Sequence, residues 1–270
     1  MKNNISWIVL ILTLLFWPIS FISNNQHTWL PFFVALFILG IDYLLFTKKY
    51  ENRYFLYLLL PLVHPGYLIF PFVAIFLNLK KIKLVPLLLY IAMLIILAFK
   101  LWGPFYSSSI FIKDPLALDL LSKKITLIPS RNLARIFENK TTPYQEKYMA
   151  NIFISLDLNN YFFALHPQEV GGNQNLNKYP FLAIIFFLVG LFSIPDEKSK
   201  TWLYSIFLSS VLSLAFLSNQ DKLDLIMYLP ISLLIYNGLN KIKKNSYSQY
   251  LLFLLVYIPF TLFDFIRLLI

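Results

Sequence analysis

Residues 82–102 read IKLVPLLLYIAMLIILAFKLW, and this stretch decides the class of the protein. A helix needs about 20 mostly apolar residues to cross the hydrocarbon core of a bilayer, and this run is long enough. Other apolar runs lie on both sides of it, at 5–23, 29–47, 54–78, 180–195, 201–218, 222–239 and 250–269. The sequence therefore predicts an all-α fold, that of a polytopic helical membrane protein.

The composition supports this class and excludes several others. Hydrophobic residues make up 59% of the chain and charged residues only 13%, whereas a soluble domain carries about 25% charged residues. The absence of Cys excludes disulfides and thiolate metal sites. The net charge is +10, but the basic residues lie between apolar runs, as in a membrane protein rather than a nucleic-acid-binding one. We expect no metal, no cofactor and no nucleic-acid partner.

The run at 54–78 is interrupted at its centre by Pro61-Leu62-Val63-His64-Pro65-Gly66, and Pro together with Gly marks a turn. Each half, 54–63 and 67–77, provides only about 15 Å of helix, which is half of a bilayer. If the run turns back, the Lys and Arg residues of the short loops gather on one side, as the positive-inside rule requires. The sequence therefore predicts a re-entrant hairpin at 54–78 and about seven crossing helices. A kinked full span is the alternative.

The same rule gives the orientation and the division of the chain. The N-terminus is expected in the cytoplasm, with the first run, 5–23, as an anchor that is not cleaved, because its apolar stretch is long and no small-x-small site follows. Membrane helices then occupy 1–102 and 179–270. The segment 103–178 between them is expected outside, because long segments are translocated across the membrane largely regardless of their charge.

Ionisable residues within the apolar runs are candidates for function, because a charge at membrane depth is costly. His64 is the only ionisable residue of the central hairpin turn, and it is expected to be buried in protein, where it can line a membrane cavity. The alternative is that His64 bonds to a neighbouring carbonyl and only pins the turn. Asp224, near an outer helix end, is the other residue of interest; snorkelling or helix-end capping explains most of the remaining ones, Asp42 among them.

The segment 103–178, expected to lie outside, contains residues that typically begin helices. Asp114-Pro115 can begin a short amphipathic helix, because Pro suits the first turn. Thr142-Pro143-Tyr144-Gln145 reads as a capping box with Pro in the first helical position, and it predicts a helix that runs to about Leu158.

Five residues of this segment can carry chemistry. Arg131 and Arg135 fall one helical turn apart, and two guanidinium groups can hold a phosphate; a solvated or headgroup-facing helix side is the alternative. His166 and Glu169 can serve as acid or base, although two ligands are too few for a metal site, and a structural loop is the alternative. Asp114 is a further candidate base, or simply a helix cap.

No catalytic signature stands out, but several stretches together resemble a known family. They are Asn160-Tyr161-Phe162-Phe163-Ala164-Leu165-His166-Pro167, Tyr179-Pro180-Phe181 with the apolar helix that follows, and Asp224 with Met227-Tyr228-Leu229-Pro230. The region from about 100 to 240 resembles the last large external loop and late helices of bacterial GT-C-type membrane glycosyltransferases, the family 39-like proteins of candidate-phyla bacteria.

This resemblance implies a protein of the bacterial inner membrane that transfers sugar from a polyprenyl-phosphate donor at the outer face. Arg131 and Arg135 would hold the phosphate, and a carboxylate such as Asp114 or Glu169 would accept the proton of the acceptor hydroxyl. Members of the family carry a catalytic acid in their first external loop, whereas the loop here, Ser23–Thr28, contains no Asp or Glu. The chain resembles the later part of such an enzyme.

Two other functions remain open. The missing acid favours a non-catalytic membrane scaffold, or a partner subunit of an envelope-polymer assembly, which would bind membrane lipids and another membrane protein. A small permease that uses the His64 hairpin is the further alternative, and the scarcity of intramembrane charge disfavours it for charged substrates.

Overall fold

The fold is known from a computed structural model that describes most of the chain. It covers residues 4–24, 29–79, 82–112, 115–128, 130, 132, 138–139, 141–163, 178–193, 197–245 and 247–269. Every regular element within these ranges is helical, and the described residues contain no β-strand beyond an isolated antiparallel bridge between Ser109 and Leu217. The predicted all-α class is confirmed.

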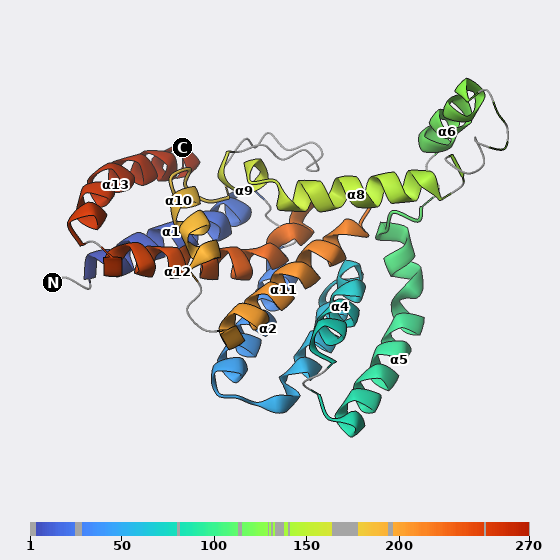
Figure 1. Cartoon of the computed structure of the whole chain (residues 1–270), viewed down its shortest axis with the longest axis horizontal. Coiled ribbons are helices and arrows are strands. Elements are labelled where there is room, and N and C mark those ends of the chain that lie inside the picture. The colour runs from blue at the N-terminus through green and yellow to red at the C-terminus, as the bar shows by residue number, and fades with distance from the viewer. Residues whose placement is uncertain are drawn as a thin grey trace.

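Helices cover all of the predicted apolar runs (Figure 1). The long ones are α1 (Asn4–Asn24), α2 (Trp29–Thr47), α5 (Leu84–Ser108), α11 (Glu197–Ala215), α12 (Tyr228–Asn245) and α13 (Tyr247–Leu269). The shorter ones are α6 (Pro115–Leu127), α8 (Thr142–Leu156), α9 (Asn159–Phe162), α10 (Ala183–Phe192) and the 3-10 helix η4 (Asp221–Met227). The local sequence pattern therefore locates the helices well, including α6 and α8 in the external segment.

Three helices are long and apolar enough to cross a membrane. They comprise Leu30–Thr47, Leu84–Ser108 and Leu223–Asn245, with 18, 25 and 23 residues. By contrast, α10 has 10 residues, and its length of about 15 Å is half of the hydrocarbon core. The structure supports a membrane protein, but it does not confirm seven crossings.

The run at 54–78 turns back on itself. It comprises the 3-10 helix η1 (Glu51–Leu59), α3 (Leu60–Val63), the 3-10 helix η2 (Pro65–Leu68) and α4 (Ile69–Asn78). The break lies at His64, whose backbone is extended with φ −151° and ψ 130°. The rings of Tyr57 on η1 and Phe70 on α4 are 5.5 Å apart, so the two arms lie side by side. The turn thus falls where Pro and Gly predicted it, and its depth in a bilayer stays a prediction.

The helix α8 is held against the end of α11 by buried amides. The side-chain amide of Asn151 donates to the carbonyls of Ala215 and Leu217 at 3.1 and 2.7 Å. Gln220 donates in return to the Ser155 hydroxyl at 2.9 Å. Because each lost partner would leave a buried polar group unsatisfied, these bonds fix α8 against the end of α11.

The start of α8 differs in detail from the predicted capping box. The residue that precedes the helix is Thr141, and its side chain makes no capping bond. The hydroxyl of Thr142 instead accepts from the backbone N–H of Asn139 at 3.0 Å, in the turn before the helix. The helix also ends at Leu156, slightly before the predicted Leu158.

Two glycines allow α10 and α12 to cross in backbone contact. A Cβ added to Gly190 would lie 1.9 Å from the carbonyl oxygen of Leu234, and one added to Gly238 would lie 1.8 Å from that of Phe186. No side chain fits at either position without moving a helix. Small residues at such crossings let membrane helices pack through their backbones.

We expect Gly190→Ala and Gly238→Ala each to lower the free energy of unfolding by about 2 kcal/mol or more, because the overlap is with rigid backbone. SDS titration of the detergent-solubilised protein measures this. Gly40→Ala is the matched control: it lies in α2 with no atom within 4 Å of the added Cβ, so the change should be neutral or stabilising by up to about 1 kcal/mol. Equal effects at all three positions would contradict the close crossing.

Candidate functional site

Most of the residues that the sequence suggests for chemistry cannot be placed. Asp114, Arg131, Arg135, His166 and Glu169 all lie outside the described residues, so their proposed roles stay predictions. Within the described part of the chain, no group of three His, Asp or Glu side chains lies close enough together to hold a metal ion. The site must therefore be built from other residues.

His64 takes part in the turn that it interrupts. Its Nδ1 accepts a hydrogen bond from the backbone N–H of Gly66 at 3.0 Å, which caps η2. Its ring lies 6.0 Å from the rings of both Phe32 and Tyr67. This geometry is that of a residue that pins the turn, although the bond goes to an N–H rather than to a carbonyl.

Asp224 is part of a buried ion pair. Its carboxylate binds the ammonium of Lys178, which also donates to Oδ1 of Asn160 at 3.1 Å. Lys178 and Asp224 are only 5% and 4% exposed. Asn160 lies on α9, Lys178 precedes α10, and Asp224 lies on η4, so the pair joins three segments that are distant in sequence.

Aromatic rings surround this ion pair. The ammonium of Lys178 is 5.4 Å from the ring centroid of Trp17 and 5.6 Å from that of Tyr161. Tyr179 and Tyr228 stack almost in parallel, with their centroids 6.2 Å apart. The edge of Trp17 on α1 packs against both, at 5.5 and 5.8 Å. We call these residues, together with Asn160, Lys178 and Asp224, the Lys178–Asp224 cluster.

The chemistry of the cluster follows from its burial. Removing two charges from water is costly, and here the mutual attraction, the bond to Asn160 and the cation–π contacts offset that cost. A carboxylate in this state is held by an ammonium, so it can act as a general base only after Lys178 moves away. The arrangement is well suited to fix the positions of the chain on either side of residues 164–177.

Sequence reasoning missed Lys178, although it singled out Asp224. Lys178 directly precedes Tyr179-Pro180-Phe181, one of the stretches that resemble the glycosyltransferases. Its backbone neighbour Tyr179 donates to the carbonyl of Tyr161 at 2.9 Å, which brings two of these stretches together. The sequence signal for the pair is a lysine just before an apolar helix, Lys178, together with an aspartate in a later helical segment, Asp224.

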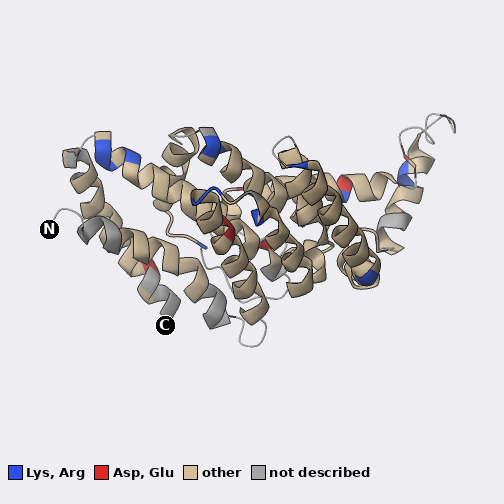
Figure 2. Cartoon of the chain, turned by 90° about the horizontal axis from the view of Figure 1, so that it is seen from below, with Lys and Arg blue, Asp and Glu red and all other residues tan. Residues whose placement is uncertain are grey.

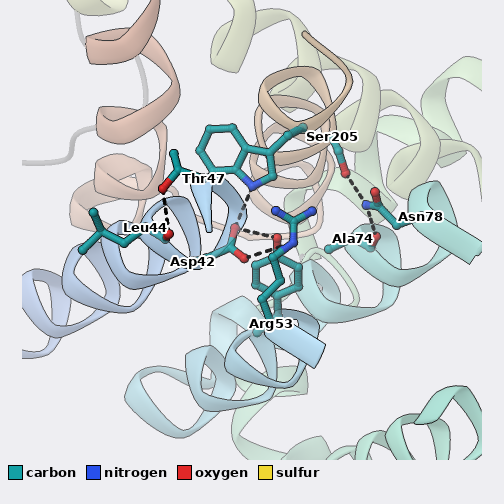
Figure 3. Close-up of polar contacts among 9 residues, drawn as sticks. Asp42, Leu44, Thr47, Arg53, Ala74, Asn78 and Ser205 are labelled. Atoms are coloured by element: carbon teal, nitrogen blue, oxygen red, sulfur yellow. Dashed lines mark hydrogen bonds and ion pairs between the residues drawn. The ribbon is translucent and has the colours of Figure 1, made fainter. Parts of the chain in front are cut away.

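A second buried carboxylate, Asp42, joins α2, η1 and α11 (Figure 3). Its Oδ2 accepts from the hydroxyl of Tyr57 and from Nε1 of Trp202, both at 2.8 Å. The Nε of Arg53 lies 3.8 Å from its Oδ1, and the Arg53 guanidinium sits 4.6 Å from the ring centroid of Phe46. Asp42 has no exposed surface. Asp42 is therefore a buried hydrogen-bond acceptor between three helices, and neither a helix-end cap nor a snorkelling side chain.

A neighbouring contact extends this connection between the hairpin and α11. The amide of Asn78, at the end of α4, donates to the Ser205 hydroxyl at 2.7 Å and to the carbonyl of Ala74 at 2.8 Å (Figure 3). Both arms of the hairpin are therefore hydrogen-bonded to α11, one through Asp42 and one through Asn78.

Comparison of the chain with known protein families, with characterised proteins and with solved structures found no match. The glycosyltransferase resemblance therefore rests on the quoted sequence stretches and stays a prediction.

We expect Asp42→Ala to lower the free energy of unfolding by about 3–5 kcal/mol, because it leaves the buried Arg53 without its charge partner. Adding Arg53→Met should recover part of the loss, because the orphaned charge is then gone. Asp119→Ala is the control, since its pair with Lys123 is exposed and should matter by less than about 1 kcal/mol. SDS titration in one detergent compares the three, and similar midpoints for Asp42→Ala and Asp119→Ala would refute the role of Asp42.

Proposed function

We propose that the chain is a multi-pass protein of the bacterial inner membrane that handles or transfers sugar from a polyprenyl-phosphate donor at the outer face, in the manner of GT-C-type glycosyltransferases. In this proposal about seven helices cross the bilayer, residues 54–78 form a re-entrant hairpin, and the N-terminus is cytoplasmic. The three apolar helices of sufficient length support a membrane location.

One observation carries the proposal. The stretches that resemble the family come from around residues 160, 179 and 224–228, and they meet in the Lys178–Asp224 cluster. Parts of one site are expected to be neighbours in space, whereas chance matches along an aromatic-rich chain have no reason to converge. The cluster fixes both ends of 164–177, the stretch that holds His166 and Glu169.

The distribution of charge supports the proposed orientation. Exposed lysines occupy the connection after α2, the one before α5 and the start of α11, which lie toward the lower side of Figure 1; these are Lys48, Lys49, Lys83, Lys198 and Lys200. Figure 2 views the chain from this lower side, with Lys and Arg in blue and Asp and Glu in red. The external segment lies at the opposite ends of α5 and α11, with α8 on the upper side. Basic loops on one side agree with a cytoplasmic underside.

The roles in this proposal follow from chemistry. Arg131 and Arg135 bind the lipid phosphate, because guanidinium groups match phosphate oxygens in geometry and charge. Asp114, His166 or Glu169 accepts the proton of the acceptor hydroxyl. The Lys178–Asp224 pair positions the loop that contains two of these groups.

The first test is mass spectrometry of the lipids that co-purify in mild detergent. Selective enrichment of a polyprenyl phosphate, or of its glycosylated form, is expected for the native chain. The double variant Arg131→Ala/Arg135→Ala should lose it by about a hundredfold, because each charged hydrogen bond contributes about 1.5–3 kcal/mol. Lys198→Ala/Lys200→Ala, which removes two exposed lysines at the start of α11, should keep it. Recovery of bulk phospholipid alone from the native chain would count against the proposal.

The burial of Lys178 and Asp224 favours a second candidate, a non-catalytic partner subunit of an envelope-polymer assembly. A buried ion pair whose residues are less than a tenth exposed can have a purely structural role. The charge-swapped variant Lys178→Asp/Asp224→Lys separates the two functions. If the pair only holds the fold, the swap should preserve the size of the native complex in native mass spectrometry. If the orientation of the loop matters for chemistry, sugar transfer should fall while the fold persists.

A further inference from the structure

An apolar groove lies between the external helix α8 and the ends of two membrane helices. Its volume is about 560 Å³, and its lining comes from the residues after α5, from the first turns of α8 and from the residue after α11: Ile110, Phe111, Thr141, Tyr144, Gln145, Tyr148, Met149 and Phe216. None of these side chains is charged. A volume of this size falls within the range of about 300–1,000 Å³ that ligand sites occupy.

Four rings form a continuous wall of the groove. The ring centroid of Phe111 lies 6.1 Å from that of Tyr144 and 6.0 Å from that of Phe216, and Phe216 lies 4.8 Å from Tyr148. The two segments that carry Phe111 and Phe216 are joined by a backbone hydrogen bond, in which the N–H of Ile110 donates to the carbonyl of Phe216 at 2.8 Å. With α8 fastened to α11 through Asn151, the groove is a preformed feature of the fold.

The groove adjoins the end of a helix that is long enough to cross a membrane. The helix α5 is one of the three long enough to span, and the groove begins just beyond its last residue, Ser108. Near that end, the side chains of Trp102 and Tyr106 are exposed, and exposed Trp and Tyr at a helix end are typical of the headgroup level. The exposed face of α5 below them, including Phe99, would contact lipid tails directly.

We propose that this groove binds one acyl chain of a membrane phospholipid. The lining offers a hydrocarbon chain apolar and aromatic contact, and it offers a headgroup or sugar few polar partners. The exposed apolar side chains of α5 end at Tyr106, four residues before the groove residue Ile110, so a tail that lies along α5 can reach the groove. This site does not depend on the proposed sugar transfer.

The experiment uses the full chain in nanodiscs that contain a phosphatidylcholine with a diazirine at the end of one acyl chain. After photolysis, mass spectrometry locates the adducts. We expect adducts on the groove residues around Phe111, Tyr148 and Met149. In Met149→Glu they should fall about tenfold or more, because a carboxylate in an apolar site repels a hydrocarbon chain. Met149 is 52% exposed, so the fold should tolerate the change.

Phe153→Glu is the matched control. Phe153 lies one helical turn beyond Met149 on α8, is 68% exposed and does not line the groove. Groove adducts should persist in this variant and in Arg131→Ala/Arg135→Ala. Adducts confined to the exposed face of α5, or an equal loss in Met149→Glu and Phe153→Glu, would overturn the proposal. Displacement of the label by equimolar polyprenyl phosphate, but not by excess phospholipid, would also overturn it by assigning the groove to an isoprenoid chain.

Discussion

The carboxylate of Asp42 holds together α2, η1 and α11. Apolar helices gain little from contact with one another in lipid, because the tails are as apolar as their side chains. Polar contacts therefore decide which helices meet, and Asp42 makes two 2.8 Å hydrogen bonds, to Tyr57 and to Trp202. Since a buried carboxylate without partners is so costly, the hairpin cannot leave this position without disrupting the whole group. Asn78 and Ser205 add a second connection of the same kind on the other arm.

The Lys178–Asp224 pair joins α9, the start of α10 and η4 in the same way as Asp42 joins α2, η1 and α11. Both sites use one carboxylate, one cation and several aromatic rings, and both connect segments that are far apart along the chain. The Lys178–Asp224 pair and the amides of Asn151 and Gln220 hold the described parts of the segment 103–178 against the long helices. The candidate site and the groove are both products of this polar attachment.

The elements set by local sequence could be predicted, and those set by distant pairing could not. The run 29–47 became α2 with the same bounds, and the turn formed at His64, because apolar length and the Pro-Gly signal are local. The partner of Asp42 lies 160 positions away, and nothing in a periodic pattern points to it. The run at 180–195 gave a helix of only ten residues, Ala183–Phe192. The residues predicted for catalysis and phosphate binding lie outside the described ranges and stay untested.

The Asp42 connection also constrains the order of events during biosynthesis. At a translation rate of about 5–20 residues per second, the 160 residues between Asp42 and Trp202 take about 10–30 s to make. During that interval α2 and the hairpin already carry Asp42, Arg53 and Tyr57, but α11 has not yet been made, so Asp42 lacks its hydrogen bond to Trp202. The packing of the hairpin and α2 around Asp42 can therefore be completed only after α11 has emerged.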